Sequence, residues 1–341
     1  MASRTGRVRC AALVLAFTLA GCSGGDEAEQ GGFAMPTPSA GKVATFSLAK
    51  LSTKYDVNQA TDDHDMSQVA SDASGNVYML SGPGPEADVL RMTSGGTVRK
   101  VARLHHVKGV LGLAPVGNGE LVVGGSGGLY RVDRHGTAER LNTRPLKHPV
   151  PIGTRPDGSV VVVDGGTVWS FKGAAAKKLY EDHTGMNFRR GAVDATGTVY
   201  VASGSSLKGT LVLAPGRKPR AVSPRGTVPG THTPVSALVV QSMTAAHGGG
   251  YYAKVVTDPD RGSLTPYVVH VGPTGSAIVL AQGTLEKSNP SCDTGKQYPA
   301  LKTPCLMPWF VVQSGKRVLV MGNPTDDGSR IPAFAIRADT K

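Results

Sequence analysis

Six of the nine histidines lie in short polar segments that lead into apolar segments rich in Val and Leu. Neutral imidazole is a ligand for Zn, Cu, Fe and Ni, and protonated imidazole binds anions. If the fold gathers these segments on one face, the side chains form a rim able to hold a metal or another ligand. The alternative is a set of separate surface histidines. The six are His64, His105, His106, His148, His183 and His232.

Acidic residues occur in the same kind of segment, and Asp65, which adjoins His64, joins the candidate rim. Clustered carboxylates can bind Ca²⁺, whereas Asp in loops rich in Gly and Pro often only caps a turn. A divalent metal is therefore the one cofactor that the residues suggest, and they identify no catalytic group. The other acids of these segments are Asp62, Asp63, Asp258, Asp260, Asp326 and Asp327.

A repeated motif indicates the elements that position these side chains. The stretch Asp72-Ala-Ser-Gly-Asn-Val-Tyr78 recurs as Asp194-Ala-Thr-Gly-Thr-Val-Tyr200, and looser copies lie between and after them. Its anchor glycines, at positions 75, 119, 158 and 197, are 44, 39 and 39 residues apart. That spacing is typical of one β-propeller blade. The Asp and Gly predict a tight turn, because Asp bonds its own backbone and Gly adopts positive φ.

A second apolar hairpin follows each anchor, but the sixth, at Ala333–Ile336, has no returning strand before the chain ends. A ring of blades must close or leave a strand edge unpaired. The alternating segment Val43–Leu48 can supply the missing outer strand. We therefore predict an all-β domain over residues 42–341, a six-bladed propeller of four-stranded antiparallel blades whose last blade is closed by an N-terminal strand.

The motif resembles the NHL repeat, whose blade pattern is Asp-x-x-Gly-Asn-Val-Tyr-Val followed by a hairpin. Residues Asp72 to Leu80 and Asp194 to Ala202 match it best. The resemblance implies the six-bladed fold more than it implies a function. Gluconolactonase-type propellers open with a Glu-Gly-Pro element. Met66-Ser67-Gln68-Val69 occupies the corresponding stretch of this chain, without the Glu, and we find no match to the histidine arrangement of streptogramin lyases.

The first residues have the pattern of an export signal. Three arginines precede an apolar run from Cys10 to Leu19 that is too short to span a bilayer. The sequence Leu19-Ala20-Gly21-Cys22 resembles the lipobox of bacterial lipoproteins. The resemblance implies that residues 1–21 are a signal peptide and that Cys22 receives a diacylglyceryl anchor and palmitate-type acylation. The alternative is an ordinary secretory signal. Residues 22–41, rich in Gly, Ser and Pro, have a composition typical of a disordered tether.

Two other cysteines, Cys292 and Cys305, remain in the domain. Outside the cytoplasm such a pair forms a disulfide, which for a loop of this length contributes about 3 kcal/mol. The alternative is two free thiols.

The chain has 37 basic and 25 acidic residues, and many of the basic ones lie in the outer hairpins. They can attract anionic lipid headgroups or an anionic wall polymer, or they can protect outer strands from edge-to-edge pairing. No aromatic residues are interleaved with them, so we expect no nucleic-acid partner.

These features favour a lipid-anchored, extracytoplasmic and monomeric module, on the outer face of the membrane, that binds a ligand or an envelope protein. The alternative is a metal-dependent lactonase-like hydrolase or a lyase that uses the His/Asp rim.

Overall fold

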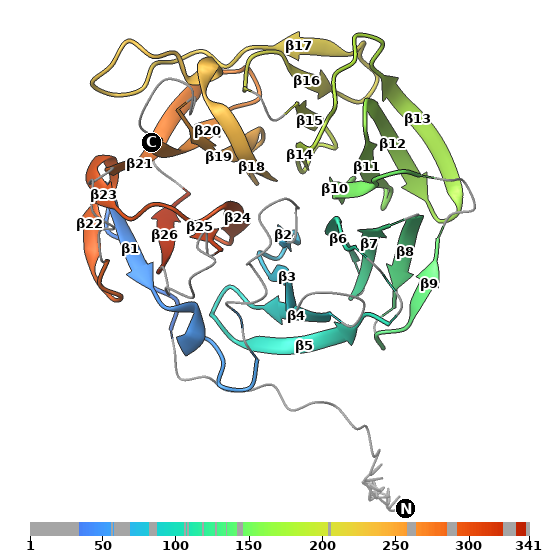
Figure 1. The fold of residues 1–341 in the computed structure, drawn as a ribbon, viewed down its shortest axis with the longest axis horizontal. Coiled ribbons are helices and arrows are strands. Elements are labelled where there is room, and N and C mark those ends of the chain that lie inside the picture. The colour runs from blue at the N-terminus through green and yellow to red at the C-terminus, as the bar shows by residue number, and fades with distance from the viewer. Residues whose placement is uncertain are drawn as a thin grey trace, which may run out of the picture.

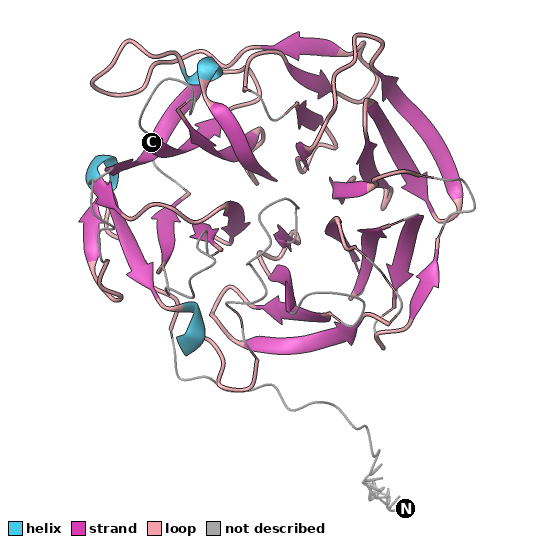
Figure 2. Cartoon of the chain, viewed as in Figure 1, coloured by secondary structure: helices cyan, strands magenta, loops and turns pink. Residues whose placement is uncertain are grey.

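The computed structural model describes residues 34–55, 57, 69–81, 87–105, 107, 109–117, 119–126, 128–133, 135–141, 146–203, 206–257, 264–284, 292–322 and 332–338. Their strands form six sheets, in which almost all neighbouring strands are antiparallel, and the sheets are arranged as a ring (Figure 1). Helical structure in the described residues is limited to the 3-10 turns η1 (Leu48–Lys50), η3 (Val235–Ala237) and η5 (Ala300–Lys302) (Figure 2). The predicted six-bladed propeller is therefore confirmed. No described helix has the length and hydrophobicity needed to cross a bilayer.

The first three blades have four strands each. From the innermost strand outward, blade 1 is β2 (Val69–Ser71), β3 (Val77–Ser81), β4 (Asp88–Met92) and β5 (Val98–Arg103). Blade 2, in the same direction, is β6 (Gly112–Gly117), β7 (Glu120–Gly125), β8 (Gly128–Val132) and β9 (Ala138–Arg140). Blade 3 is β10 (Val150–Thr154), β11 (Val160–Asp164), β12 (Thr167–Lys172) and β13 (Ala175–Glu181).

Blade 4 also has four strands, and the last two blades each have a fifth. Blade 4 is β14 (Arg190–Val193), β15 (Val199–Ala202), β16 (Thr210–Leu213) and β17 (Arg220–Val222). Blade 5 is β18 (Val239–Ala245), β19 (Tyr251–Val256), β20 (Pro266–Val271), β21 (Ala277–Thr284) and β23 (Thr303–Pro304). Blade 6 is β24 (Phe310–Ser314), β25 (Arg317–Met321), β26 (Ala333–Arg337), β1 (Lys42–Phe46) and β22 (Gln297–Pro299).

The ring closes as the sequence predicts. Strand β1 pairs antiparallel with β26, with Val43 opposite Ile336 and Phe46 opposite Ala333. The other edge of β1 pairs with β22, where Val43 lies opposite Tyr298. The N-terminal strand is thus bonded on both sides, and the C-terminal strand has no open edge along this register.

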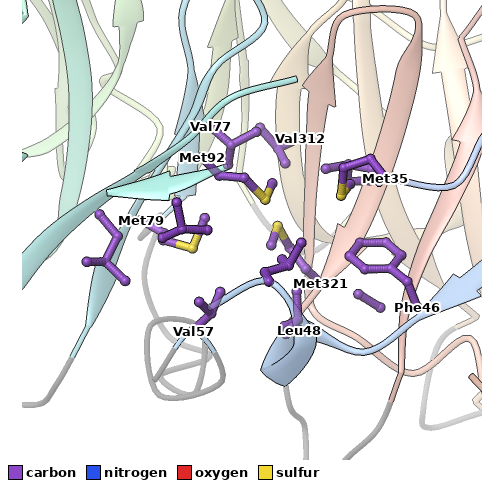
Figure 3. Close-up of a cluster of buried hydrophobic side chains, with 14 of the residues drawn as sticks. Met35, Phe46, Leu48, Val57, Val77, Met79, Met92, Val312 and Met321 are labelled. Carbon is purple, nitrogen blue, oxygen red and sulfur yellow. The ribbon is translucent and has the colours of Figure 1, made fainter. Parts of the chain in front are cut away.

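A cluster of buried apolar side chains joins blades 6 and 1 across this closure (Figure 3). Met79 and Met92 of blade 1 meet Met321 of blade 6, and all three are fully buried. Phe46 of β1 and Met35 of the preceding segment pack into the same cluster. Burying one such side chain contributes roughly 1.5–3 kcal/mol, so the closing strand is held by packing as well as by its ladder.

The repeated Asp forms the turn after each matching innermost strand. Asp72 Oδ1 accepts the backbone N–H groups of Ser74 and Asn76, both at 2.9 Å. Its Oδ2 accepts the Asn76 amide at 2.8 Å and the Tyr78 hydroxyl at 3.2 Å. Asp194 binds its own turn and Tyr200 in the same way. The motif is therefore a closed turn in which every carboxylate oxygen has donors. We call the end of the ring that carries these turns the turn face.

The segment before β1 runs across the turn face. Arg317, at the start of β25, donates to the Met35 carbonyl at 3.4 Å and to Thr37 Oγ1 at 2.9 Å. The same guanidinium donates to the carbonyl of Ser94, in the turn after β4, at 3.0 Å. One arginine thus holds the N-terminal segment, blade 6 and blade 1 together at this end.

A loop from blade 5 covers the outer side of the closure and contains both remaining cysteines. β22 pairs with β1, and β23 pairs parallel with β21, so the loop spans blades 5 and 6. The Cys292 thiol donates to the Pro304 carbonyl at 2.9 Å. Burial and then a hydrogen bond with Cys305 raise the pKa of Cys292, so the two sulfur groups are in contact. The disulfide between them stays a prediction.

Lys254 of β19 is a buried charged residue that is 1% exposed. Its Nζ donates to Gln241 Oε1 at 2.9 Å, and no ion pair with a carboxylate is found among the described residues. Burial lowers the pKa of this amine to about 7. The amine is therefore easily neutralised in the folded state.

Gly75→Ala tests the contact between blades 6 and 1. Gly75 has φ +77°, and a Cβ there would meet the backbone nitrogen of Gly315. Gly158, at the matching turn of blade 3, has φ +79° and no atom within 4 Å of that position. We expect Gly158→Ala to cost about 1–2 kcal/mol of unfolding free energy. Gly75→Ala should cost about 1–3 kcal/mol more, measured by chemical denaturation. Equal losses would contradict this packing.

Lys254→Met tests the buried amine. Between pH 7 and 10 the unfolded chain binds a proton at this lysine that the folded chain does not, so stability rises with pH. The slope is at most about 1.4 kcal/mol per pH unit. We expect wild type to gain stability over this window relative to Lys254→Met. The exposed Lys208→Met variant should follow wild type, and parallel curves for all three proteins would contradict the prediction.

Candidate functional site

A cavity of about 730 Å³ occupies the channel inside the ring. It is walled by the innermost strands β2, β6, β10, β14 and β18 and by the turns that follow them. Apolar groups such as Leu113, Ile152 and Met243 form part of the wall, and polar groups of the turns complete it. This mixture of apolar wall and few polar groups is typical of small-molecule sites.

The cavity lies at the turn face. Its lining includes Asp72, Gly119, Arg155, Asp194 and His247, which all follow innermost strands. None of the described residues in the loops that lead into those strands lines it. The site is thus at the opposite end of the channel from the loops that carry the predicted histidine rim.

The two carboxylates at the cavity are already occupied by donors. Asp72 accepts four hydrogen bonds, three from its own turn and one from Tyr78 of β3. Asp194 accepts from Thr196, Thr198 and Tyr200, and also from the backbone N–H of Gly250 in blade 5 at 3.4 Å. Their oxygens are therefore committed to the turns rather than directed at a ligand.

Two arginines of the lining have unused donors. The Nε atoms of Arg91 and Arg155 are buried and have no hydrogen-bond partner among the described residues. Arg91 comes from β4 and Arg155 from the turn after β10. Burial lowers the pKa of Arg155, and Asp157 opposes that effect. A buried donor without a partner lowers the stability of the folded protein, so an acceptor bound at these groups would be stabilising.

His247 lies beside the cavity in the turn after β18. Its backbone N–H donates to Gln313 Oε1 of blade 6 at 2.8 Å. Burial lowers the pKa of the imidazole, and the nearby Asp72 raises it by a smaller amount. The ring is therefore predominantly neutral at pH 7. Burial and Asp72 both raise the pKa of Tyr78, which keeps that hydroxyl protonated as a donor.

The structure places four of the seven residues of the predicted rim. His105, His148, His183 and His232 are all exposed, and none of them lines the cavity. No three His, Cys, Asp or Glu side chains within the described ranges form a metal-binding group. His64, Asp65 and His106 lie outside the described residues, as do Asp62, Asp63, Asp258, Asp260, Asp326 and Asp327.

In blade 3, loops of two kinds lie on the same face of the ring. The backbone N–H of His148 donates to Asp164 Oδ1 at 2.7 Å, and Asp164 ends β11. In the next loop, Asp182 N–H donates to the Gly166 carbonyl at 2.8 Å. Loops leading into innermost strands therefore meet the loops that join second and third strands, but the cavity is elsewhere.

Sequence reasoning missed Arg91, Arg155 and His247. A comparison of repeats contains a signal for two of them. Arg155 occupies the turn position that Asp72 and Asp194 occupy, because in all three turns this residue accepts from the Gly three residues later. Arg91 corresponds to Arg131 in the next blade. A residue that departs from a repeat pattern does not make the local interaction that the pattern provides, so such positions are candidates for a functional role.

No protein-family model and no curated protein matches the sequence. Among solved structures, an auxiliary nutrient binding protein from Bacteroides ovatus has a TM-score of 0.55 at 14% identity, over 86% of this chain and 76% of that one. A gluconolactonase from Xanthomonas campestris has a TM-score of 0.48 at 14% identity, over 89% and 99%. Virginiamycin B lyase from Staphylococcus aureus has a TM-score of 0.48 at 9% identity, over 86% and 98%. Similar propellers thus include a binding protein and enzymes, and likeness at these identities shows the fold alone.

Proposed function

We propose that the protein is a lipid-anchored, extracytoplasmic binding module that holds a small ligand in the channel cavity at the turn face. The observation that carries the proposal is the cavity itself. Its volume of about 730 Å³ suits a small organic molecule. Its carboxylates are saturated with donors, so they are poorly placed to act as bases, whereas its arginines have donors to offer. The same fold occurs in an auxiliary nutrient binding protein.

The first described residues of the chain and the cavity lie on the same side of the ring. Arg317 holds Met35 and Thr37 at the turn face, where the cavity lies. The stretch from Cys22 to Met35 can extend over no more than about 45 Å. Lipid on Cys22 would therefore keep the cavity end within that distance of the membrane surface. A ligand released at or crossing the envelope would meet the cavity there.

Cys22→Ser tests the anchor, and Cys10→Ser, in the apolar run of the proposed signal, is its matched control. We expect wild type and Cys10→Ser to incorporate labelled palmitate and to partition into detergent. Cys22→Ser should lose the label and appear in the aqueous phase, because acyl chains supply the membrane affinity. A labelled Cys22→Ser protein, or an unlabelled wild type, would exclude the anchor.

The thiol state of the exported protein tests the compartment. Cys292 and Cys305 are in contact, so an oxidant of the dithiol-exchange class can take two electrons and two protons and leave a disulfide. We expect neither cysteine of the exported protein to react with maleimide before reduction, and both to react afterwards, as read by mass spectrometry. Two reactive thiols without reduction would contradict both the disulfide and an oxidising location.

Thr244→Trp tests binding in the cavity, because Thr244 lines it and an indole would fill part of the volume. Thr274→Trp, on an exposed turn of blade 5, is the control. A panel of sugars, sugar acids, dicarboxylates and dipeptides is screened by thermal shift against full-length protein in detergent. We expect a panel member to raise the melting temperature of wild type and Thr274→Trp but not of Thr244→Trp. Shifts shared by all three proteins would place the site elsewhere.

A further inference from the structure

Two arginines of the cavity depart from the repeat, and the structure of their own blades does not supply acceptors for their Nε atoms. In the turns of blades 1 and 4 the residue that directly follows the innermost strand is an Asp that caps its own turn. In blade 3 the residue at this position is Arg155. The capping role passes to Asp157, whose Oδ1 accepts from Ser159 N–H at 2.9 Å. The turn is therefore complete without the Arg155 side chain, and Arg155 is one of the residues that line the cavity.

Arg91 differs from its counterpart in the next blade in what surrounds it. Arg131 of β8 forms a two-pronged contact with Glu120, with Nη2 to Oε2 at 2.7 Å and Nε to Oε2 at 3.2 Å. The residue equivalent to Glu120 in blade 1 is Asn76, and its amide is already bonded to Asp72. Arg91 consequently has no ion-pair partner among the described residues.

A second positive charge adds to this imbalance. Arg91 lies directly opposite Arg99 of β5 in the antiparallel ladder. Like charges at directly opposed positions destabilise a sheet unless an anion lies between or beside them. The wall of the cavity thus combines an arginine without an acid, a second arginine in place of an acid, and two carboxylates saturated by their own turns. The buried Nε atoms of both arginines still lack an acceptor among the described residues.

We propose that the channel cavity binds a small organic anion, and that Arg155 and Arg91 recognise its oxyanion group, a carboxylate or a phosphate. The proposal rests on the proposed function, since it names the ligand class of that same cavity. A planar guanidinium pairs with either group through parallel charge-assisted hydrogen bonds, and the low-polarity wall strengthens them. Bound anion would supply the acceptors that both Nε atoms lack.

The experiment measures binding by titration calorimetry with the full-length protein in detergent at constant ionic strength. The probes are citrate and glucuronate as carboxylates, glucose 6-phosphate as a phosphate, and glucose as the neutral partner of the last two. Arg91→Gln and Arg155→Gln each remove one guanidinium. Arg217→Gln, an exposed arginine on blade 4 away from the cavity, removes the same charge elsewhere.

We expect at least one anionic probe to bind wild type, with glucose binding at least tenfold more weakly. Arg91→Gln and Arg155→Gln should each weaken binding about 10–100-fold, and Arg217→Gln should leave it unchanged. Preference among citrate, glucuronate and glucose 6-phosphate separates carboxylate from phosphate recognition. Anion binding that is insensitive to both cavity substitutions overturns the proposal.

Two further outcomes separate this proposal from the proposed function. If a neutral ligand binds, and Thr244→Trp abolishes its binding while the arginine variants do not affect it, the ligand class is wrong and the binding module stands. If neither anionic nor neutral probes of either panel bind wild type, both are overturned.

Stability supplies an independent readout through Arg155→Asp, which restores the residue of the repeat. If Arg155 has only a structural role, Arg155→Asp should be less stable than wild type. If Arg155 binds the ligand, its unpaired Nε destabilises the ligand-free protein. Arg155→Asp should then have an unchanged or higher melting temperature and should lose anion binding. A lower melting temperature with anion binding retained would contradict the assignment.

Discussion

The pairing of β1 with β26 is the constraint on which the rest of the molecule depends. A propeller has no single core; each blade packs on its neighbours, and the described core clusters lie between blades. Removing one contact in such a ring exposes two blade faces and one strand edge. The chain meets this requirement by bonding β1 on both sides and by inserting Met35 and Phe46 between blades 6 and 1. Arg317 reinforces the same seam from the turn face.

That closure also organises the channel. Only a complete ring brings the turns after five innermost strands around one cavity, and only then do Arg91 of blade 1 and Arg155 of blade 3 share a wall. The hydrogen bond from Ser314 Oγ to the Gly75 carbonyl, at 2.9 Å across the seam, fixes the blade 1 turn that forms part of this wall. The stability of the seam and the shape of the proposed site are therefore linked.

The repeat separates structural residues from candidates for recognition. Asp72 and Asp194 are explained completely by their turns, since both oxygens of each accept donors that would otherwise lack partners. Arg155 and Arg91 are not explained in this way, because their buried Nε atoms have no partner among the described residues. Buried Lys254 is a different case, because Gln241 satisfies one donor and the depressed pKa of its amine reduces the charge that is buried.

Short-range rules in the sequence alone were enough to predict the blades, their turns and the closing strand. Asp capping, glycine at positive φ and two-residue alternation act within a few residues, and the paired segments Val43–Leu48 and Ala333–Ile336 were each incomplete alone. Only tertiary structure decided which end of the channel holds a cavity and which arginines lack partners. Those features depend on side chains from different blades meeting across the ring, and no spacing along the chain encodes that distance. The position of the cavity illustrates the difference: it lies at the turn face, whereas His148 and His183 are exposed in loops at the other end of the channel, and the repeat pattern does not specify at which end a cavity forms.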